Sequence, residues 1–207
     1  MKINYLKIFF VLALSTSVLT SCVSEDDYSI PKTVDYALSE SFNDIGTGAG
    51  STEVAIELDG WVNFNTSNSR LWVGKLFSNN KFAEFSSNFS ASGTSDQTWL
   101  ITPAIDLTAT TSPKLSFSTL TRYGNGYPLK AMVSTDYDGT TAGIATATWT
   151  ELNFVKPTAD DVSVRSGAIS LSSYTTSDNV RIAFKYTGSK SGVKTTLQLD
   201  NIKIAKN

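Results

Sequence analysis

The chain has 207 residues, of which 41% are hydrophobic and only 17% charged, and its formal net charge is −2. Acidic residues (19) outnumber basic ones (17), so there is no cationic surplus to hold a phosphate backbone, and we expect no nucleic-acid partner. With no histidine and a single cysteine, the sequence excludes Ser-His and Cys-His catalysis, histidine-bound zinc and an internal disulfide.

The N-terminal segment predicts export and lipid attachment. The apolar run Ile8–Leu14 is too short to cross a hydrocarbon core, which needs ~20 residues, but it is typical of a secretory signal. The sequence Leu-Thr-Ser-Cys that ends at Cys22 resembles a bacterial lipobox. We therefore expect residues 1–21 to be a lipoprotein signal peptide and Cys22 to carry the lipid that anchors the chain. The alternative is an ordinary signal, cleaved elsewhere, with a buried free cysteine.

Residues 22–35 are polar, contain one proline and have no period, which predicts a flexible tether after the lipidated cysteine. Within it, Glu25, Asp26 and Asp27 resemble the signal that sends some Gram-negative lipoproteins to the outer face of the outer membrane. This pattern favours a protein that is lipid-anchored in the outer membrane and faces the cell exterior. A solvated tether without a sorting role is the alternative.

From residue 36 to residue 207, short alternating apolar runs are separated by turns, without a convincing helical period. The alternating sets are Leu115, Phe117 and Thr119; Leu129, Ala131 and Val133; Val180, Ile182, Phe184 and Tyr186; Leu197 and Leu199; Ile202 and Ile204. Such alternation predicts sheets that each have one solvent-exposed face and one apolar face. The apolar faces then pack together in one all-β antiparallel sandwich. The shift of phase at Asp200-Asn201 predicts a β-bulge. Pro103 cannot donate to a ladder, which predicts an edge or a strand end there.

Several motifs follow one another in a specific order. The most specific are Trp-Leu-Ile-Thr-Pro-Ala-Ile-Asp-Leu at 99–107 and Ser-Thr-Asp-Tyr-Asp-Gly at 134–139. Together with Gly60-Trp61 and the Leu-Asp-Asn-Ile run at 199–202, they resemble choice-of-anchor J and cleaved-adhesin domains, which are distantly similar to MAM domains. The resemblance extends over about residues 37–205. It implies an antiparallel jelly roll on a surface or secreted protein, without a common catalytic activity.

The resemblance also implies a structural calcium ion where the first and last strands lie side by side. The matching carboxylates are Glu40 and Asp200, with Asp44 as a candidate third ligand, because calcium takes six to eight oxygens. The alternative is a surface Glu40 and an Asp200 that caps a bulge or turn. Residues 136–139 also place two carboxylates before a glycine, but the later acid of a calcium loop is missing, so a hairpin turn is the better explanation.

A second candidate is a carbohydrate platform, in which aromatic rings stack on sugar faces and polar groups fix the hydroxyls. The glycine-rich loop at 122–127 supplies the candidate residues Arg122, Tyr123, Asn125 and Tyr127. Trp72, close to Arg70 and Lys75, is a further candidate. The alternative for the loop tyrosines is that they are ordinary loop aromatics, and for Trp61, Trp99 and Trp149 we expect core packing.

Hydrolysis finds little support in the sequence. No alternating run of acids occurs, and the adjacent Asp160 and Asp161 would point to opposite faces of a strand. We therefore expect no enzyme but a monomeric surface lipoprotein that binds a ligand, most readily a glycan. The alternative is a structural or adhesive module that binds a neighbouring surface protein.

Overall fold

The computed structural model describes residues 33–49, 52–67 and 70–206 of the chain. Contacts between residues group Val34–Asn207 into one compact unit. The predictions for the signal peptide, for the lipidated Cys22 and for nearly all of the tether fall on residues 1–32, which lie outside the described residues. In the described ranges, no helix is long and apolar enough to cross a membrane.

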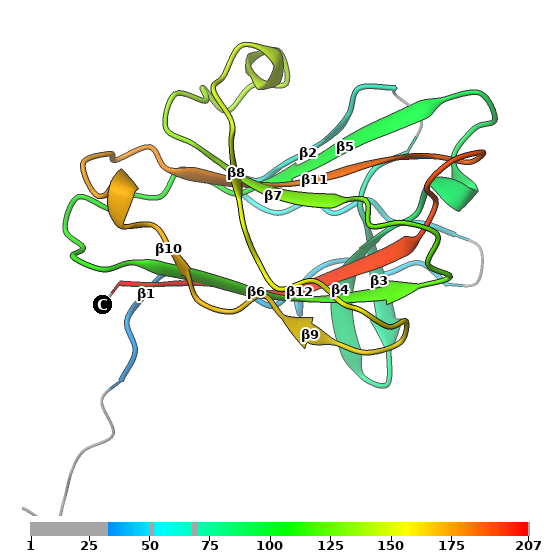
Figure 1. The fold of residues 1–207 in the computed structure, drawn as a ribbon, viewed down its shortest axis with the longest axis horizontal. Helices are drawn as coiled ribbons and strands as arrows, with labels where there is room; N and C mark the ends of the chain where they lie inside the picture. Colours follow the sequence, from blue (N-terminus) through cyan, green and yellow to red (C-terminus); the bar gives the residue numbers. More distant parts are fainter. Residues whose placement is uncertain (1–32, 50–51, 68–69, 207) are drawn as a thin grey trace, which may run out of the picture. The chain divides into compact units, whose positions relative to one another are not determined.

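Two antiparallel sheets form the unit, and Figure 1 shows them as two layers. Sheet A, the lower layer of the figure, has the order β10-β6-β12-β4-β3, with β1 paired to β12 and β9 paired to β6. Its strands are β1 (Tyr36–Glu40), β3 (Val73–Phe77), β4 (Asn80–Phe85), β6 (Lys114–Arg122), β9 (Val164–Arg165), β10 (Ile169–Ser170) and β12 (Thr196–Ala205).

Sheet B, the upper layer, has the order β2-β5-β11-β7-β8. Its strands are β2 (Val62–Asn65), β5 (Ser95–Ile101), β7 (Leu129–Ser134), β8 (Thr150–Leu152) and β11 (Arg181–Ser189). From β4 to β7 the chain changes sheet at every strand, as in a jelly roll. The predicted fold class, an all-β antiparallel jelly-roll sandwich, is confirmed.

The core between the sheets contains the predicted alternating residues. Leu115 and Phe117 of β6 are buried, and so are their partners on the other sheet, such as Ile182 and Phe184 of β11. The Phe117 and Phe184 rings meet edge to face, with their centroids 5.0 Å apart. A period of two therefore identifies the inward face of each long strand, because side chains of a strand alternate between its two sides.

The predicted bulge is present in β12. The register against β6 shifts between Asp200 and Lys203, and Asn201 has the left-handed φ of 54°. The extra residue lets Leu199 and Ile202, three positions apart, both point into the core. The bulge also divides one edge of β12, which pairs with β4 before it and with β1 after it.

The prediction that each sheet has one solvent-exposed face is wrong for sheet B. Trp99 and Ala183 point away from the main core, yet they are buried in a second apolar cluster with Tyr137 and Ile144. The latter two residues belong to the connection 135–149 between β7 and β8, which covers this face at the top of Figure 1. The Trp149 ring packs against this cluster, with its centroid 5.3 Å from that of the Trp99 ring.

Two local predictions are refined by the structure. β5 ends at Ile101, just before Pro103, and it pairs with both β2 and β11, so Pro103 marks a strand end and not an edge. The Asp-Gly turn at 138–139 is not a hairpin turn, because it lies inside the long connection 135–149. There Asp138 accepts a hydrogen bond from the Thr140 N–H at 2.8 Å, and Gly139 takes the φ of 87° that favours glycine.

Candidate functional site

Three hollows follow one another along the outer face of sheet A. The first, the Tyr123 hollow, is lined by Asn88, Phe89, Tyr123, Lys194 and Thr196. The second, the Asp200 hollow, is lined among others by Phe77, Asn80, Ser118, Ser163, Gln198 and Asp200. The third, the Tyr36 hollow, is lined among others by Tyr36, Ser116, Ser118, Arg165, Asn201 and Lys203. We call the three together the β6–β12 groove.

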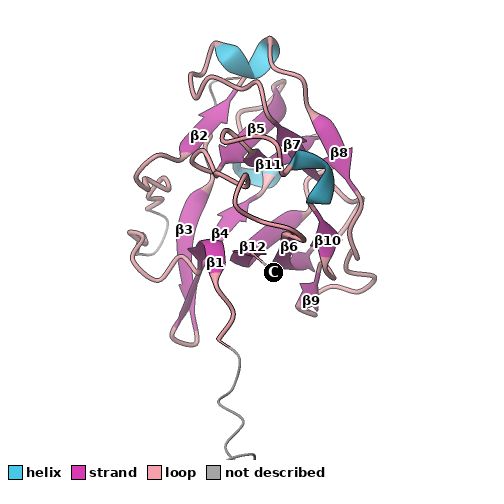
Figure 2. Cartoon of the chain, turned by 90° about the vertical axis from the view of Figure 1, so that its left-hand side faces the viewer, coloured by secondary structure: helices cyan, strands magenta, loops and turns pink. Residues whose placement is uncertain are grey.

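The regular geometry of β6 and β12 arranges the three hollows in one row. Thr196, Gln198 and Asp200 alternate outward along β12, and Ser118 of β6 lines both the second and the third hollow. At ~3.3 Å per residue, the path from Thr196 to Lys203 measures roughly 23 Å. Figure 2 shows the β3–β4 hairpin and β9 projecting downward on either side of this face. The groove can therefore accommodate an extended ligand.

Exposed aromatic rings are spread along the groove. The side chains of Tyr123, Phe77 and Phe89 are 78%, 68% and 63% exposed, and Tyr36 is 39% exposed. Phe77 stands at the tip of the β3–β4 hairpin, whose two turn residues Ser78 and Asn79 both have positive φ, as a tight hairpin turn requires. Their position beside the hollows makes these rings available to a ligand, and this face is therefore the candidate site.

Asp200 supplies a carboxylate to the middle of the groove. Its Oδ2 accepts a hydrogen bond from Asn80 Nδ2 at 3.1 Å, and its Oδ1 accepts one from the Asn201 N–H at 2.6 Å. Partial burial raises the pKa of the Asp200 carboxyl, and these two hydrogen bonds oppose the rise. The residue thus holds the bulge together and still lines the Asp200 hollow, where it can accept hydrogen bonds from a ligand.

The Tyr36 hollow carries the opposite charge. Arg165 of β9 and Lys203 of β12 both line it, and among the described residues neither forms an ion pair. The Lys203 Nζ lies 5.5 Å from the centre of the Tyr36 ring, within the range of a cation–π contact. This end of the groove therefore presents two cations beside an aromatic face.

The loop 122–127 is firmly tied, in contrast to the flexible segment that its glycines suggest. Asn125, predicted to bind a ligand, is used within the protein: its Nδ2 donates to the Gly192 carbonyl at 2.8 Å and its Oδ1 accepts from the Lys194 N–H at 2.9 Å. Arg122 pairs with Asp161 at 2.7 Å. Among the predicted loop residues, Tyr123 is the one that reaches the groove, and its left-handed φ of 54° is a strained conformation that these ties hold.

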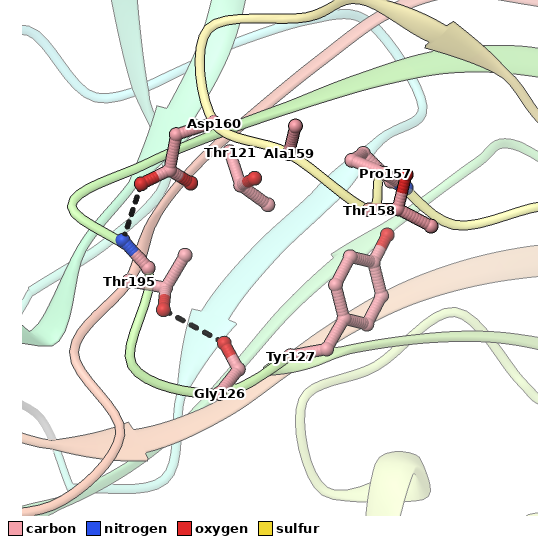
Figure 3. Close-up of a pocket in the computed structure, with 9 residues that line it drawn as sticks. Thr121, Gly126, Tyr127, Pro157, Thr158, Ala159, Asp160 and Thr195 are labelled. Atoms are coloured by element: carbon pink, nitrogen blue, oxygen red, sulfur yellow. Dashed lines mark hydrogen bonds between the residues drawn. The ribbon is translucent and has the colours of Figure 1, made fainter.

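Tyr127 lies in a different hollow from Tyr123. Figure 3 shows it with Pro157 and Thr158 on one side of a polar hollow beneath the loop, and its hydroxyl end points toward these two residues. The ring packs against the core and against Phe154, and burial raises the pKa of its hydroxyl to about 12. The structure therefore separates the two predicted tyrosines, and it does not form the single platform predicted from the sequence.

The same view explains Asp160 and Asp161. Neither lies on a strand; the Asp160 Oδ2 accepts a hydrogen bond from the Gly124 N–H at 2.8 Å, which Figure 3 marks with a dashed line. Together with the Arg122–Asp161 ion pair, this contact fixes the start of the loop. Each of the two acids thus contacts a direct chain neighbour of Tyr123.

Trp72 is not a binding residue, which corrects the sequence-based prediction. Its side chain is fully buried and packs against Phe85 and, edge to face, against Tyr186. The nearby Arg70, which suggested a surface site, is itself buried, and its guanidinium pairs with Glu53. That hydrogen-bonded pair lowers the pKa of the Glu53 carboxyl. A ring without access to solvent cannot stack on a sugar.

The predicted calcium ligands do not form a cluster of carboxylates. In the described part of the chain, no group of three or more acidic, histidine or cysteine side chains could hold a metal ion. Glu40 on β1 accepts a hydrogen bond from the Phe42 N–H, Asp44 is exposed, and Asp200 faces the groove. Calcium binding stays a prediction. A rise of the melting temperature in millimolar calcium would support it, and an unchanged temperature would remove it.

Sequence reasoning missed most of the groove. Phe89 stands among polar residues, Phe77 directly follows Leu76 at the end of a short strand, and Tyr36, Arg165 and Lys203 come from three strands that are far apart in the sequence. The one usable sequence signal is that Lys203 follows the predicted bulge, whereas Arg165 comes beside the bulge only through the pairing of β9 with β6.

Comparisons with known proteins agree with this architecture. Residues 105–206 match a family model described as "Domain of unknown function (DUF5017)". No curated protein matches the chain. Two similar solved structures are the K1 and K3 cleaved adhesin domains of Lys-gingipain from Porphyromonas gingivalis W83. K1 has a TM-score of 0.52 at 19% identity and covers 82% of this chain and 98% of its own. K3 has a TM-score of 0.52 at 16% identity, with 84% and 100% covered.

A weaker likeness is to the CBM22-1 xylan-binding domain of Paenibacillus barcinonensis Xyn10C, with a TM-score of 0.44 at 15% identity and coverage of 84% and 96%. At 19% and 16% identity, the comparisons with the two cleaved adhesin domains concern the fold alone. The resemblance to cleaved-adhesin domains is thus confirmed as a likeness of fold, whereas the choice-of-anchor J resemblance stays a prediction. Over residues 105–206 the chain is similar to the DUF5017 domain, and its described fold is similar to that of the cleaved adhesin domains.

Proposed function

We propose that the protein is a non-catalytic surface lipoprotein that binds a glycan in the β6–β12 groove. The observation that carries the proposal is the groove itself, in which the exposed rings of Tyr36, Phe77, Phe89 and Tyr123 line the same hollows as hydrogen-bonding side chains. Sugars offer apolar C–H faces together with many hydroxyls. A few aimed polar groups among aromatic rings suit that chemistry.

The carboxylates of the groove support binding without turnover. Among the described residues that line the three hollows, Asp200 is the one carboxylate. Glycoside hydrolysis by the common mechanisms needs two carboxyl groups that face each other across the bond to be cleaved. A single carboxylate serves as a hydrogen-bond acceptor for hydroxyls.

The anchor belongs to the same proposal. Lipid on Cys22, followed by the tether to β1, would hold the domain at the outer membrane, facing the exterior, without a transmembrane helix. Labelling of cells with a radioactive fatty acid tests this part. The label should appear on the wild-type protein and be absent from the Cys22→Ala variant, and an unlabelled, cytosolic wild type would contradict it.

The second candidate function is adhesion to a surface protein. It is favoured by apolar side chains that are not aromatic, because Leu76 and Val162 are more than half exposed. A protein partner would bury ~1,600 Å² in total, which exceeds a groove one sugar chain wide.

A glycan panel with three proteins tests glycan binding. The wild type should retain at least one glycan, and the Phe89→Ala/Tyr123→Ala variant should lose it by about tenfold or more, because two stacking rings are removed. Val155→Ala is the control, since Val155 is an exposed apolar residue that does not line the groove. The proposal fails if the wild type retains no glycan, or if the double variant binds as well as the control.

A further inference from the structure

Charge is unevenly distributed along the β6–β12 groove. Arg165 and Lys203 line the Tyr36 hollow, whose described lining contains no acidic residue, whereas Asp200 lines the adjacent hollow. The two hollows meet at Ser118. A ligand that spans both must therefore accommodate two cations at one position and a carboxylate at the next.

The Tyr36 hollow has the parts of a site for an anionic group. Its volume of about 450 Å³ is within the usual range of ligand pockets, ~300–1,000 Å³. The guanidinium of Arg165 can donate two parallel hydrogen bonds to a carboxylate or a sulfate ester, and the Lys203 ammonium can donate a third. The half-exposed Tyr36 ring, 5.5 Å from the Lys203 Nζ, offers a flat face for a sugar ring next to these donors.

The Asp200 hollow favours a neutral sugar. A second carboxylate there would face Asp200, and like charges repel at short range. Asn80, Gln198 and Ser118 also line this hollow and can hydrogen-bond hydroxyls without adding charge. The groove thus distinguishes two neighbouring positions of one chain by charge.

We propose that the groove selects an acidic glycan, with a uronate or a sulfated sugar in the Tyr36 hollow and a neutral sugar in the Asp200 hollow. This inference rests on the proposed glycan binding and adds to it the class of glycan and the hollow in which its charged sugar lies. The shared chemistry of the two sources is a fixed negative charge on a sugar ring.

Paired oligosaccharides test the inference. Uronate-containing oligosaccharides are compared with their carboxyl-reduced forms, and sulfated ones with their desulfated forms, so that each pair differs in charge on the same sugar backbone. We expect the wild-type protein to bind the acidic member of at least one pair about tenfold more tightly, as the loss of a charged hydrogen-bonding partner predicts. The pair that responds identifies the source of the charge.

Two variants place that preference in the hollow. Lys203→Gln and Arg165→Gln should each reduce the acidic preference severalfold while the neutral member binds as before. Lys130→Gln is the matched control, because Lys130 is an exposed lysine of sheet B, paired with Glu151. It should keep the full preference. If a groove variant fails to fold, the salt dependence of wild-type binding provides the test. The affinity of the wild type for the acidic member should fall as the sodium chloride concentration rises, and its affinity for the neutral member should not.

The possible failures are distinguishable. If the wild type binds both members of every pair equally, or if the control loses the preference as much as the groove variants do, the acidic-glycan inference is wrong while glycan binding stands. If the wild type binds no glycan of the panel, the proposed function itself is wrong.

Discussion

Aromatic residues occur on both outer faces of the sandwich, but they are covered on one face and exposed on the other. On sheet B, the connection 135–149 covers Trp99, and the rings of Tyr137 and Trp149 pack over that face. On sheet A, no such connection crosses the groove in the described part of the chain, and Phe77 and Tyr123 stay exposed. Rings that the chain buries add to stability, whereas rings left exposed beside hollows are available to a ligand.

This contrast gives each face its own expected response to mutation. Changes on sheet B should alter the stability of the fold, and changes on sheet A should alter ligand binding.

The largest effect is expected for Trp99→Ala. Removing a side chain that is only 5% exposed leaves a cavity between sheet B and its covering connection, so the free energy of unfolding should fall by about 3–5 kcal/mol. Urea unfolding measures the change. At temperatures where the variant stays folded, its glycan affinity should equal that of the wild type. A stability within 1 kcal/mol of the wild type, on the order of a surface substitution, would show that the connection does not seal this face.

The Phe89→Ala/Tyr123→Ala variant is the converse case. Because both rings are more than 60% exposed, its unfolding free energy should change by no more than about 0.5 kcal/mol per substitution. Its glycan affinity should fall by about tenfold. A large loss of stability with unchanged affinity would reverse the roles that we assign to the two faces.

Asp160→Ala should have a smaller effect on glycan affinity, because Asp160 does not line the groove and acts on it only through the loop 122–127. The substitution removes the acceptor of the Gly124 N–H and loosens the loop that holds Tyr123. We expect roughly threefold weaker glycan binding, because Tyr123 must then be ordered on binding. Asp178→Ala, which removes an exposed acid from another loop, is the control. Equal affinities of the two variants would mean that the tie does not matter for binding.

The smallest effect concerns the pH dependence of stability. Burial raises the pKa of Asp200, so the folded protein keeps this proton to a higher pH than the unfolded chain does. Between the ordinary pKa and the raised one, the folded state binds more protons, and the contribution of Asp200 to the unfolding free energy falls as the pH rises. Asp200→Asn removes this contribution.

The melting temperature of Asp200→Asn should therefore rise relative to that of the wild type as the pH increases through the window, and the difference should stay constant above it. The free-energy change is expected to be below about 1 kcal/mol. A difference that instead shrinks with rising pH would mean that the fold favours the charged form of Asp200.

The sequence predicts the core better than the site, for a physical reason. Alternation along β6, β7, β11 and β12 reports which side of each strand is apolar, and this pattern is local to the strand. The break at Asp200-Asn201 likewise predicts the bulge from a few neighbouring residues. Both features need only the geometry of a single extended segment.

The groove depends on pairing between distant strands. Tyr36, Arg165 and Lys203 come together only because β1 pairs with β12 and β9 pairs with β6. Trp72 is a residue that the sequence wrongly assigned to the site. The charges of Arg70 and Lys75 suggested an exposed ring, but both side chains lie close to Glu53, and the Trp72 ring faces the core. Local composition cannot distinguish a buried ion pair from a solvated one.

Hydrogen exchange of the protein, with and without the glycan that it retains most tightly, tests the central claim most directly. We predict slower exchange of amides in β6, β12 and the loop 122–127 when the glycan is bound, with no change in the connection 135–149. Slower exchange over that connection and sheet B, with β6 and β12 unaffected, would contradict the account.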